Sequence, residues 1–351
     1  MKKSVININK NVKTSFGSAD SVGRLKLFSA MGIQHWNDKI YVADNAEMKI
    51  KVFDQNGKLL KNFGGRGRGP GEFISMKGFK VINGEILLFD QNLQRMNKFK
   101  LTGEFITSYN IKGIQSPVKI YSIKDNYLLL YPSFDNDKTY FAHIYNEKFS
   151  KVHNSFIDLN EFVDEGAVTN RLFMAWLGNI YVGDKGNKIY YVPYFYDGQI
   201  FIFTKNDEWQ LSDVKTGVLQ QDPFLFIDKD HFRRPDITHS SVTINSPIRI
   251  IAKNTTRGLY KTGDYFYHFT FTDVGEYRIF GMEIYNDNFS SIGFSPIDSV
   301  KISNQRFNFL AWNVDDIDNN GNFYFRERYQ DGMRIRIIKF GLNKQIHVYR
   351  Q

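Results

Sequence analysis

Apolar and polar residues alternate over short stretches of this chain, and Asp, Asn and Gly residues separate the stretches. Residues 38–44, 50–54 and 57–60 form one such series, and residues 84–90, 96–100 and 103–106 form a second. Alternation with a period of two over four to eight residues is typical of strands that bury one face. Asp, Asn and Gly favour the tight turns of antiparallel hairpins. The pattern predicts an all-β chain of short antiparallel strands.

The two series are copies of one repeat. Three pairs of identical residues share an offset of 46 positions: Ile40 and Ile86, Phe53 and Phe99, Gly57 and Gly103. A repeat of about 40 to 50 residues with four strands is the unit of a β-propeller blade. We therefore predict a six-bladed β-propeller of four-stranded antiparallel blades, built as one domain over residues 1–351. The apolar positions at the constant offset should be buried between blades, which concerns Ile40, Val42, Ile86 and Leu88.

Later copies of the repeat are looser. The third blade is expected at 125–130 and 140–145 with its last strand near 149–152, the fifth at 263–267 and 277–280, and the sixth at 320–325, 334–340 and 345–349. The fourth blade has two possible registers, centred on residues 188–191 or on residues 197–202, and the pattern does not choose between them.

Two stretches are longer than a blade requires, and one lies ahead of the first blade. Residues 154–177, with a possible short helix at 159–164, and residues 215–247 are expected to be insertions. The strand-like residues 5–8 precede the first blade. We expect this N-terminal strand to complete the last blade and to close the ring.

Three segments of the first repeat resemble a known family. Residues 40–44, 51–58 and 64–73 are similar to the NHL-repeat pattern, and especially to uncharacterised bacterial six-bladed propellers described as NHL-like or TolB-like. The resemblance implies a binding or scaffold propeller in an extracytoplasmic location, periplasmic or at the cell surface. It also leaves open a metal-dependent lyase or lactonase, and a nucleic-acid-binding domain of the NHL type.

Composition removes several alternatives. The chain has no Cys, which excludes disulfides, thiolate metal sites and a Cys nucleophile. No run approaches the roughly 20 apolar residues of a membrane-spanning helix, and no targeting peptide is visible at the N-terminus. The net charge of +9 suggests a polyanion partner. However, basic residues alternate with apolar ones at 48–53 and 333–337, which describes solvated strand faces, so nucleic acid is not the favoured partner.

Two motifs have simpler structural explanations. The glycine-rich residues 64–71 lack the Lys-Ser/Thr ending and the following helix of a phosphate loop, so we interpret them as an interblade turn. Residues 316–327 formally match a calcium-binding loop, but residues 323–325 continue a strand, which favours a hairpin turn. The seven histidines show no paired spacing. We therefore predict no catalytic residue, no metal and no cofactor.

The candidate site is a rim of the propeller. Turns between the second and third strands of a blade lie on the same face as the connections between blades, so several loops should share one rim. This rim would collect Arg66, Arg68, Arg95, Arg326, Arg328 and Tyr329. Guanidinium groups offer a rigid fork of donors for carboxylate, phosphate or glycan hydroxyl groups. We thus predict a non-catalytic propeller that binds a protein, peptide or glycan there. The competing interpretation is that Arg326 and Arg328 only pair with Glu327, Asp331 or neighbouring blades.

Overall fold

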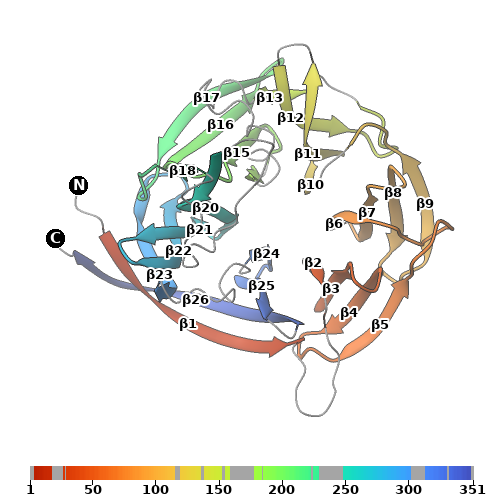
Figure 1. Cartoon of the computed structure of the whole chain (residues 1–351), viewed down its shortest axis with the longest axis horizontal. Coiled ribbons are helices and arrows are strands. Elements are labelled where there is room, and N and C mark those ends of the chain that lie inside the picture. The colour runs from red at the N-terminus through yellow and green to blue at the C-terminus, as the bar shows by residue number, and fades with distance from the viewer. Residues whose placement is uncertain are drawn as a thin grey trace.

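The computed structural model describes a ring of β-sheets around a central channel (Figure 1). The described residues are 4–17, 27, 29–114, 119–135, 138–151, 155–158, 178–183, 185–222, 224–228, 248–301, 313–329 and 332–348. The predicted all-β six-bladed propeller of four-stranded antiparallel blades is confirmed. No helix long enough and apolar enough to cross a bilayer occurs in this described part of the chain.

The first two blades follow the repeat closely. Blade 1 contains β2 (Ala30–Trp36), β3 (Lys39–Asp44), β4 (Lys49–Asp54) and β5 (Leu59–Gly64), and blade 2 contains β6 (Met76–Ile82), β7 (Glu85–Asp90), β8 (Arg95–Lys100) and β9 (Phe105–Asn110). Each blade runs outward from the channel in chain order, and all its pairs are antiparallel. The four apolar residues predicted to lie between blades, Ile40, Val42, Ile86 and Leu88, are fully buried.

The third and fourth blades correct or complete the sequence interpretation. They contain β10 (Lys119–Ile123), β11 (Asn126–Asp135), β12 (Lys138–Tyr145) and β13 (Phe156–Asp158), then β14 (Asn179–Val182), β15 (Lys188–Val192), β16 (Gln199–Lys205) and β17 (Trp209–Thr216). The last strand of blade 3 is β13, so its prediction at 149–152 was wrong. Phe149 instead has a φ of 55° in a turn and stacks on Tyr127 at 4.8 Å between ring centroids. In blade 4 both proposed registers are occupied, the first by β15 and the second by β16.

The fifth and sixth blades share one continuous sheet. They contain β20 (Asn254–Thr262), β21 (Tyr265–Val274), β22 (Tyr277–Asn286) and β23 (Ser291–Lys301), then β24 (Asn313–Ile317), β25 (Asn322–Tyr329), β26 (Gly332–Val348) and β1 (Ser4–Phe16). Strand β1 pairs antiparallel with β26 along most of its length. The separate strand predicted at 345–349 was wrong, because β26 continues through that segment to pair with β1. The N-terminal strand therefore occupies the outer position of the last blade.

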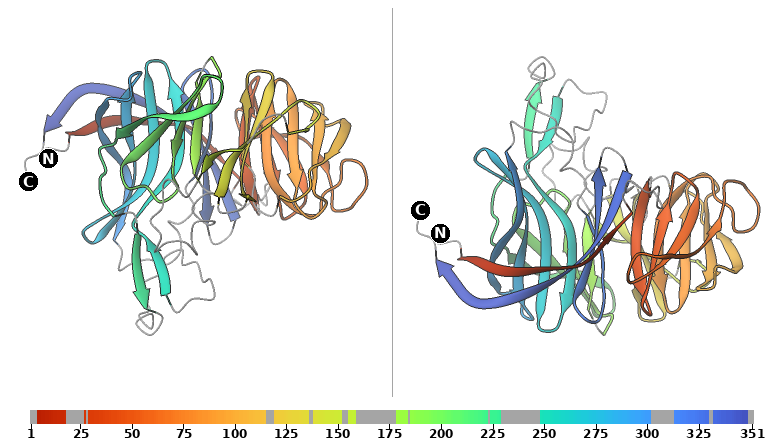
Figure 2. Two further views of the ribbon diagram at one scale, coloured as in Figure 1. Left: turned by 90° about the horizontal axis from the view of Figure 1, so that it is seen from above. Right: turned by 90° about the horizontal axis from the view of Figure 1, so that it is seen from below.

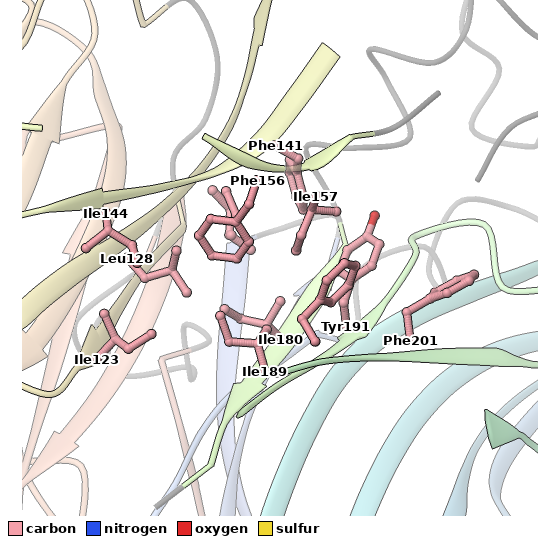
Figure 3. Close-up of a cluster of buried hydrophobic side chains, with 13 residues drawn as sticks. Ile123, Leu128, Phe141, Ile144, Phe156, Ile157, Ile180, Ile189, Tyr191 and Phe201 are labelled. Carbon is pink, nitrogen blue, oxygen red and sulfur yellow. The ribbon is translucent and has the colours of Figure 1, made fainter. Parts of the chain in front are cut away.

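Apolar side chains from adjacent blades fill the space between the sheets. Figure 3 shows this at the junction of blades 3 and 4, where Leu128, Phe141 and Ile144 approach Ile180 and Ile189. The burial of such surfaces is worth about 25 cal/mol per Å² of apolar area. A single blade has two apolar faces, so only neighbours on both sides can cover them. The closed ring satisfies this requirement for every blade.

A two-stranded hairpin projects from one face of the ring (Figure 2). It consists of β18 (Phe224–Asp228) and β19 (Ile248–Ala252), and it leads directly into β20 at Asn254. The hairpin therefore stands at the end of the channel where the innermost strand of blade 5 begins. The predicted insertion at 215–247 contains β18, but its residues 229–247 lie outside the described residues. The insertion at 154–177 is described only at 155–158, and its predicted helix lies outside the described residues.

Candidate functional site

The innermost strands of all six blades line a cavity in the central channel. These strands are β2, β6, β10, β14, β20 and β24, and the cavity has a volume of about 290 Å³. Its wall includes the first residue of β10 (Lys119), of β14 (Asn179) and of β24 (Asn313), so it lies toward the end of the channel where inner strands begin. We call this space the channel cavity. A cavity bounded by rigid strands is a common location for a ligand site.

Four of the six inner strands carry a β-bulge near their start. In each, the register with the second strand skips one residue: Met31 in β2, Lys77 in β6, Arg257 in β20 and Asp315 in β24. All four skipped residues line the channel cavity. A bulge re-aims a side chain relative to regular pleating, and bulges are over-represented beside functional sites. Met31 and Lys77 are again separated by the repeat offset of 46 positions, so the bulge belongs to the blade repeat while the side chain placed there varies.

The channel cavity is strongly basic. Among the described residues its lining contains one carboxylate, Asp315, and five cationic side chains, which are Lys77, Lys80, Lys119, Arg257 and Arg326. Arg326 neutralises Asp315 in a two-pronged ion pair, with Nε to Oδ2 at 2.7 Å and an NH group to Oδ1 at 3.1 Å. Its remaining NH group donates to the Ala30 carbonyl at 2.7 Å. This pair joins blade 6 to blade 1 and leaves the other cations of the cavity without that carboxylate.

Arg257 and Lys77 have no anionic partner among the described residues. The Arg257 guanidinium carbon lies 4.7 Å from the Phe271 ring centroid and 5.5 Å from that of Tyr194, within the range of cation–π contact. Its Nε is buried and forms no hydrogen bond with the described residues. A buried donor without an acceptor costs about 1–3 kcal/mol. The charge of Arg257, a residue that lines the cavity, is therefore left without an anionic partner in the described part of the chain.

Lys119 is a third cation with unusual electrostatics. Its Nζ donates to the Gly178 carbonyl at 2.7 Å and to Asn179 Oδ1 at 2.9 Å, both neutral acceptors from blade 4. Burial lowers the pKa of Lys119 to about 7; Asp315 opposes this shift, and Arg257 and Arg326 add to it. The ammonium is therefore only partly protonated near neutral pH. An anion in the cavity would stabilise the charged form.

Tyrosine side chains supply the apolar part of the wall. Tyr260 donates its hydroxyl to the Val314 carbonyl at 2.7 Å, and burial raises the pKa of Tyr260 well above its ordinary range. Burial also raises the pKa of Tyr121. Both phenols are therefore neutral in the physiological range. They offer ring faces and dipoles to a ligand, and the cations supply the charge.

A buried polar network supports β20 behind the cavity. Thr256, which also lines the cavity, donates its hydroxyl to the Pro193 carbonyl at 2.7 Å and lies 3.0 Å from His268 Nε2. His268 Nδ1 lies 2.9 Å from Glu283 Oε2, and His268 and Glu283 are fully buried. Because the Thr256 hydroxyl donates its proton to the Pro193 carbonyl, the Thr256 oxygen is the acceptor in its contact with His268 Nε2. The hydroxyl, imidazole and carboxylate follow the order of a nucleophilic triad, but the imidazole is not placed as a base.

The six residues predicted for the rim do not all meet in one place. Arg95 donates to the carbonyls of Arg68, Gly69 and Glu72 at 3.2, 2.9 and 2.9 Å, so it holds the interblade loop between β5 and β6. Arg66 and Arg68 are exposed on that loop. Arg326 lines the channel cavity instead, paired with Asp315. Arg328 and Tyr329 lie at the end of β25, and their side chains are outside the described part.

Sequence reasoning missed the inner-strand residues. Lys77, Lys119 and Arg257 fall in the first strand of their blades, whereas the repeat was recognised from the second, third and fourth strands. The sequence did contain a signal for Lys77. The first strand of a blade lies next to the channel, and Lys77 comes shortly after the glycine-rich turn that precedes the first strand of blade 2. Sequence alone does not show the bulge that distinguishes Lys77 from its neighbours.

The potential metal motifs form ordinary structure. In the hairpin between β24 and β25, Asp318 Oδ1 accepts the backbone N–H groups of Asn320 and Asn322 at 2.9 Å each, and Glu327 pairs with Arg336 at 3.1 Å. The segment is thus a strand turn, as the sequence interpretation preferred. The described residues hold no group of three or more His, Cys, Asp or Glu side chains arranged to bind a metal ion.

Comparison with known proteins agrees with this architecture. The family DUF5128, described as a 6-bladed beta-propeller, matches residues 26–229. No curated protein matches the chain in sequence. A crystal structure of a DUF4221 member from Bacteroides vulgatus is similar at a TM-score of 0.58 and 10% identity, covering 97% of this chain and 100% of that one.

Two further structures share the fold. A Bacteroides fragilis protein described as exported has a TM-score of 0.56 at 11% identity, covering 95% of this chain and 96% of that one. Virginiamycin B lyase from Staphylococcus aureus has a TM-score of 0.50 at 10% identity, covering 94% and 99%. At these identities the likeness describes the fold alone.

Proposed function

Since the chain belongs to the DUF5128 family of six-bladed β-propellers, we propose that it is a non-catalytic binding protein that holds a small polar ligand in the channel cavity. The observation that carries this proposal is the cavity of about 290 Å³ at which six inner strands converge. Bulges in four of those strands place variable side chains on its wall. A rigid wall with variable side chains is suited to selective recognition.

Two features favour binding over catalysis at this site. Thr256 is only 2% exposed, and its hydroxyl donates to a backbone carbonyl, so the hydroxyl is not poised as a nucleophile. The Tyr260 hydroxyl is likewise committed to the Val314 carbonyl. A lyase reaction, as the name of the Staphylococcus aureus protein describes for that protein, requires a group that moves a proton, and both of these hydroxyls donate theirs to backbone carbonyls.

We also propose that the protein is located outside the cytoplasm and binds its ligand there. The sequence resembles bacterial propellers implied to be extracytoplasmic, and the similar Bacteroides fragilis protein is described as exported. Fractionation of the source cells with an antibody against this chain tests this location. Recovery in the cytoplasmic fraction alone would contradict it.

The binding site is tested by filling the cavity. Gly32 lines it, and a Cβ added there would meet only Phe79, at 3.4 Å, so Gly32→Leu should fold and occlude the space. Ligand-observed NMR against a fixed library of carboxylates, phosphates, sugars and amino acids should find compounds that bind the wild type and not Gly32→Leu.

The matched control is Gly65→Leu, because a Cβ at Gly65 meets nothing within 4 Å and Gly65 does not line the cavity. This variant should bind the same compounds as the wild type. Binding that survives in Gly32→Leu, or a library without any binder, would refute the channel cavity as the site.

A further inference from the structure

We propose that the ligand of the channel cavity is a multivalent anion, with separate carboxylate or phosphate groups that pair with Arg257 and Lys77 across the channel. This inference rests on the proposed function and specifies its ligand class. It uses the charge of the wall, the opposed placement of two bulges and the missing acceptor of one guanidinium.

The two cations lie on opposite sides of the ring. Lys77 belongs to β6 of blade 2 and Arg257 to β20 of blade 5, three blades apart in a ring of six. Figure 1 shows β6 and β20 facing each other across the channel. Both residues occupy the bulge at the start of their strand, and both line the cavity. One ligand between them would meet a cation on each side.

Neither cation is neutralised by the protein within its described part. Lys77 is half-buried and forms no ion pair or hydrogen bond with another described residue. Arg257 contacts two aromatic rings, and its buried Nε has no acceptor. Like charges confined to one cavity repel each other, and burial weakens the screening that water provides. An anion with two separated negative charges would neutralise Lys77 and Arg257 together and so remove the repulsion between them.

The other charged groups of the wall indicate which anions fit. The one carboxylate that the described residues contribute to the wall, Asp315, is neutralised by Arg326, so it does not repel an incoming anion. Lys80 Nζ lies 3.7 Å from Asp316 Oδ1 and is already partly compensated. Lys119 lies on β10 of blade 3, next to the blade that carries Lys77, and it adds a third positive site when it is protonated. A ligand with two or three acidic groups matches this distribution better than a single charge does.

The geometry of Arg257 supports a carboxylate or phosphate partner in particular. Its guanidinium contacts the rings of Tyr194 and Phe271, and a side chain already packed against the protein loses less entropy on binding. A planar guanidinium presents parallel N–H donors that match two oxygens of one acidic group. Neutral hydroxyl ligands accept such bonds but leave the charge uncompensated.

Isothermal titration with acetate, succinate, citrate and inorganic phosphate tests the proposal, with glucose as the neutral probe. We expect succinate and citrate to bind the wild type and acetate to bind at least about tenfold more weakly, equivalent to about 1.4 kcal/mol. Arg257→Met and Lys77→Met should each weaken citrate binding by about tenfold or more. Phosphate binding as tight as that of citrate would overturn the claim that separated acidic groups are needed.

Lys58→Met is the matched control, because it removes one positive charge from an exposed residue that does not line the cavity. It should leave citrate affinity unchanged. If Arg257→Met lowers the melting temperature, Arg257→Lys provides a second readout: it restores the charge without the fork and should recover part of the affinity.

The outcomes separate this inference from the proposed function. If Gly32→Leu abolishes citrate binding but Arg257→Met and Lys77→Met do not weaken it, the cavity is the site and the inference about charge is wrong. Citrate binding that survives Gly32→Leu contradicts the cavity itself. Equal affinity for glucose and citrate, absence of binding by every anion, or loss of binding in Lys58→Met would each overturn the inference.

Discussion

Lowering the pH from about 7.5 to about 5 should destabilise this protein through His143 in blade 3. The imidazole is fully buried. Nε2 donates to the Tyr131 carbonyl at 2.7 Å, and Nδ1 lies 2.9 Å from Ser155 Oγ. Lys151 Nζ donates to the same Ser155 oxygen at 2.6 Å, so the Ser155 hydroxyl donates to Nδ1. Both ring nitrogens are therefore satisfied in the neutral form.

The expected loss of stability can be worked out from the lowered pKa of His143. Burial lowers the pKa of His143 from 6.5 to about 3, the Tyr131 carbonyl opposes that shift, and the Lys151 charge adds to it. The unfolded chain binds a proton below pH 6.5, whereas the folded chain does not until pH falls to about 3. Stability is therefore complete above pH 6.5 and declines between those values. At pH 5 the expected loss from this one residue is about 2 kcal/mol.

Urea unfolding of the wild type and of His143→Gln at both pH values measures this effect. Gln keeps one donor for the Tyr131 carbonyl and one acceptor for Ser155, and it does not titrate. The variant should therefore lose about 2 kcal/mol less than the wild type on acidification. Leu60→Gln, at an exposed residue of β5 that does not titrate, is the control and should keep the wild-type pH dependence. Equal pH dependence in His143→Gln and the wild type would refute the reasoning.

Two further predictions concern buried charges. Glu283 accepts hydrogen bonds from the Leu219 N–H at 2.6 Å and the Tyr285 hydroxyl at 2.7 Å, and it pairs with His268. Glu283→Gln should therefore lower the free energy of unfolding, measured by chemical denaturation, by about 3–5 kcal/mol, whereas Glu276→Gln, at an exposed pair with Lys301, should lower it little. A small loss in Glu283→Gln would show that the network does not stabilise the fold. Because burial lowers the pKa of Lys119 to about 7, citrate affinity measured by titration calorimetry should fall as pH rises above 7, where citrate no longer titrates. Lys119→Met should remove this fall. The same fall in both proteins would show that the Lys119 charge does not contact the ligand.

The blade repeat was predictable because its signals are local. Alternation at Ile40 and Val42, and again 46 positions later at Ile86 and Leu88, reports a strand with a buried face, and all four side chains are buried. Asp, Asn and Gly between strands report hairpins. Where local signals failed, longer contacts decided: β26 extends to Val348 because β1, more than 300 residues earlier, pairs with it, and Phe149 turns out of a strand to stack on Tyr127.

The candidate site was decided by the tertiary structure. Arginine side chains are visible in the sequence, but their partners are not, so Arg326 was assigned to the rim although it pairs with Asp315 inside the channel. The channel cavity is assembled from residues between Met31 and Arg326 that only ring closure brings together. A single bulged residue changes which side chain faces the channel, since strand side chains alternate with a period of two. The sequence by itself therefore determined the blades, and the closed ring and its bulges determined that Lys77, Lys119 and Arg257 share one wall.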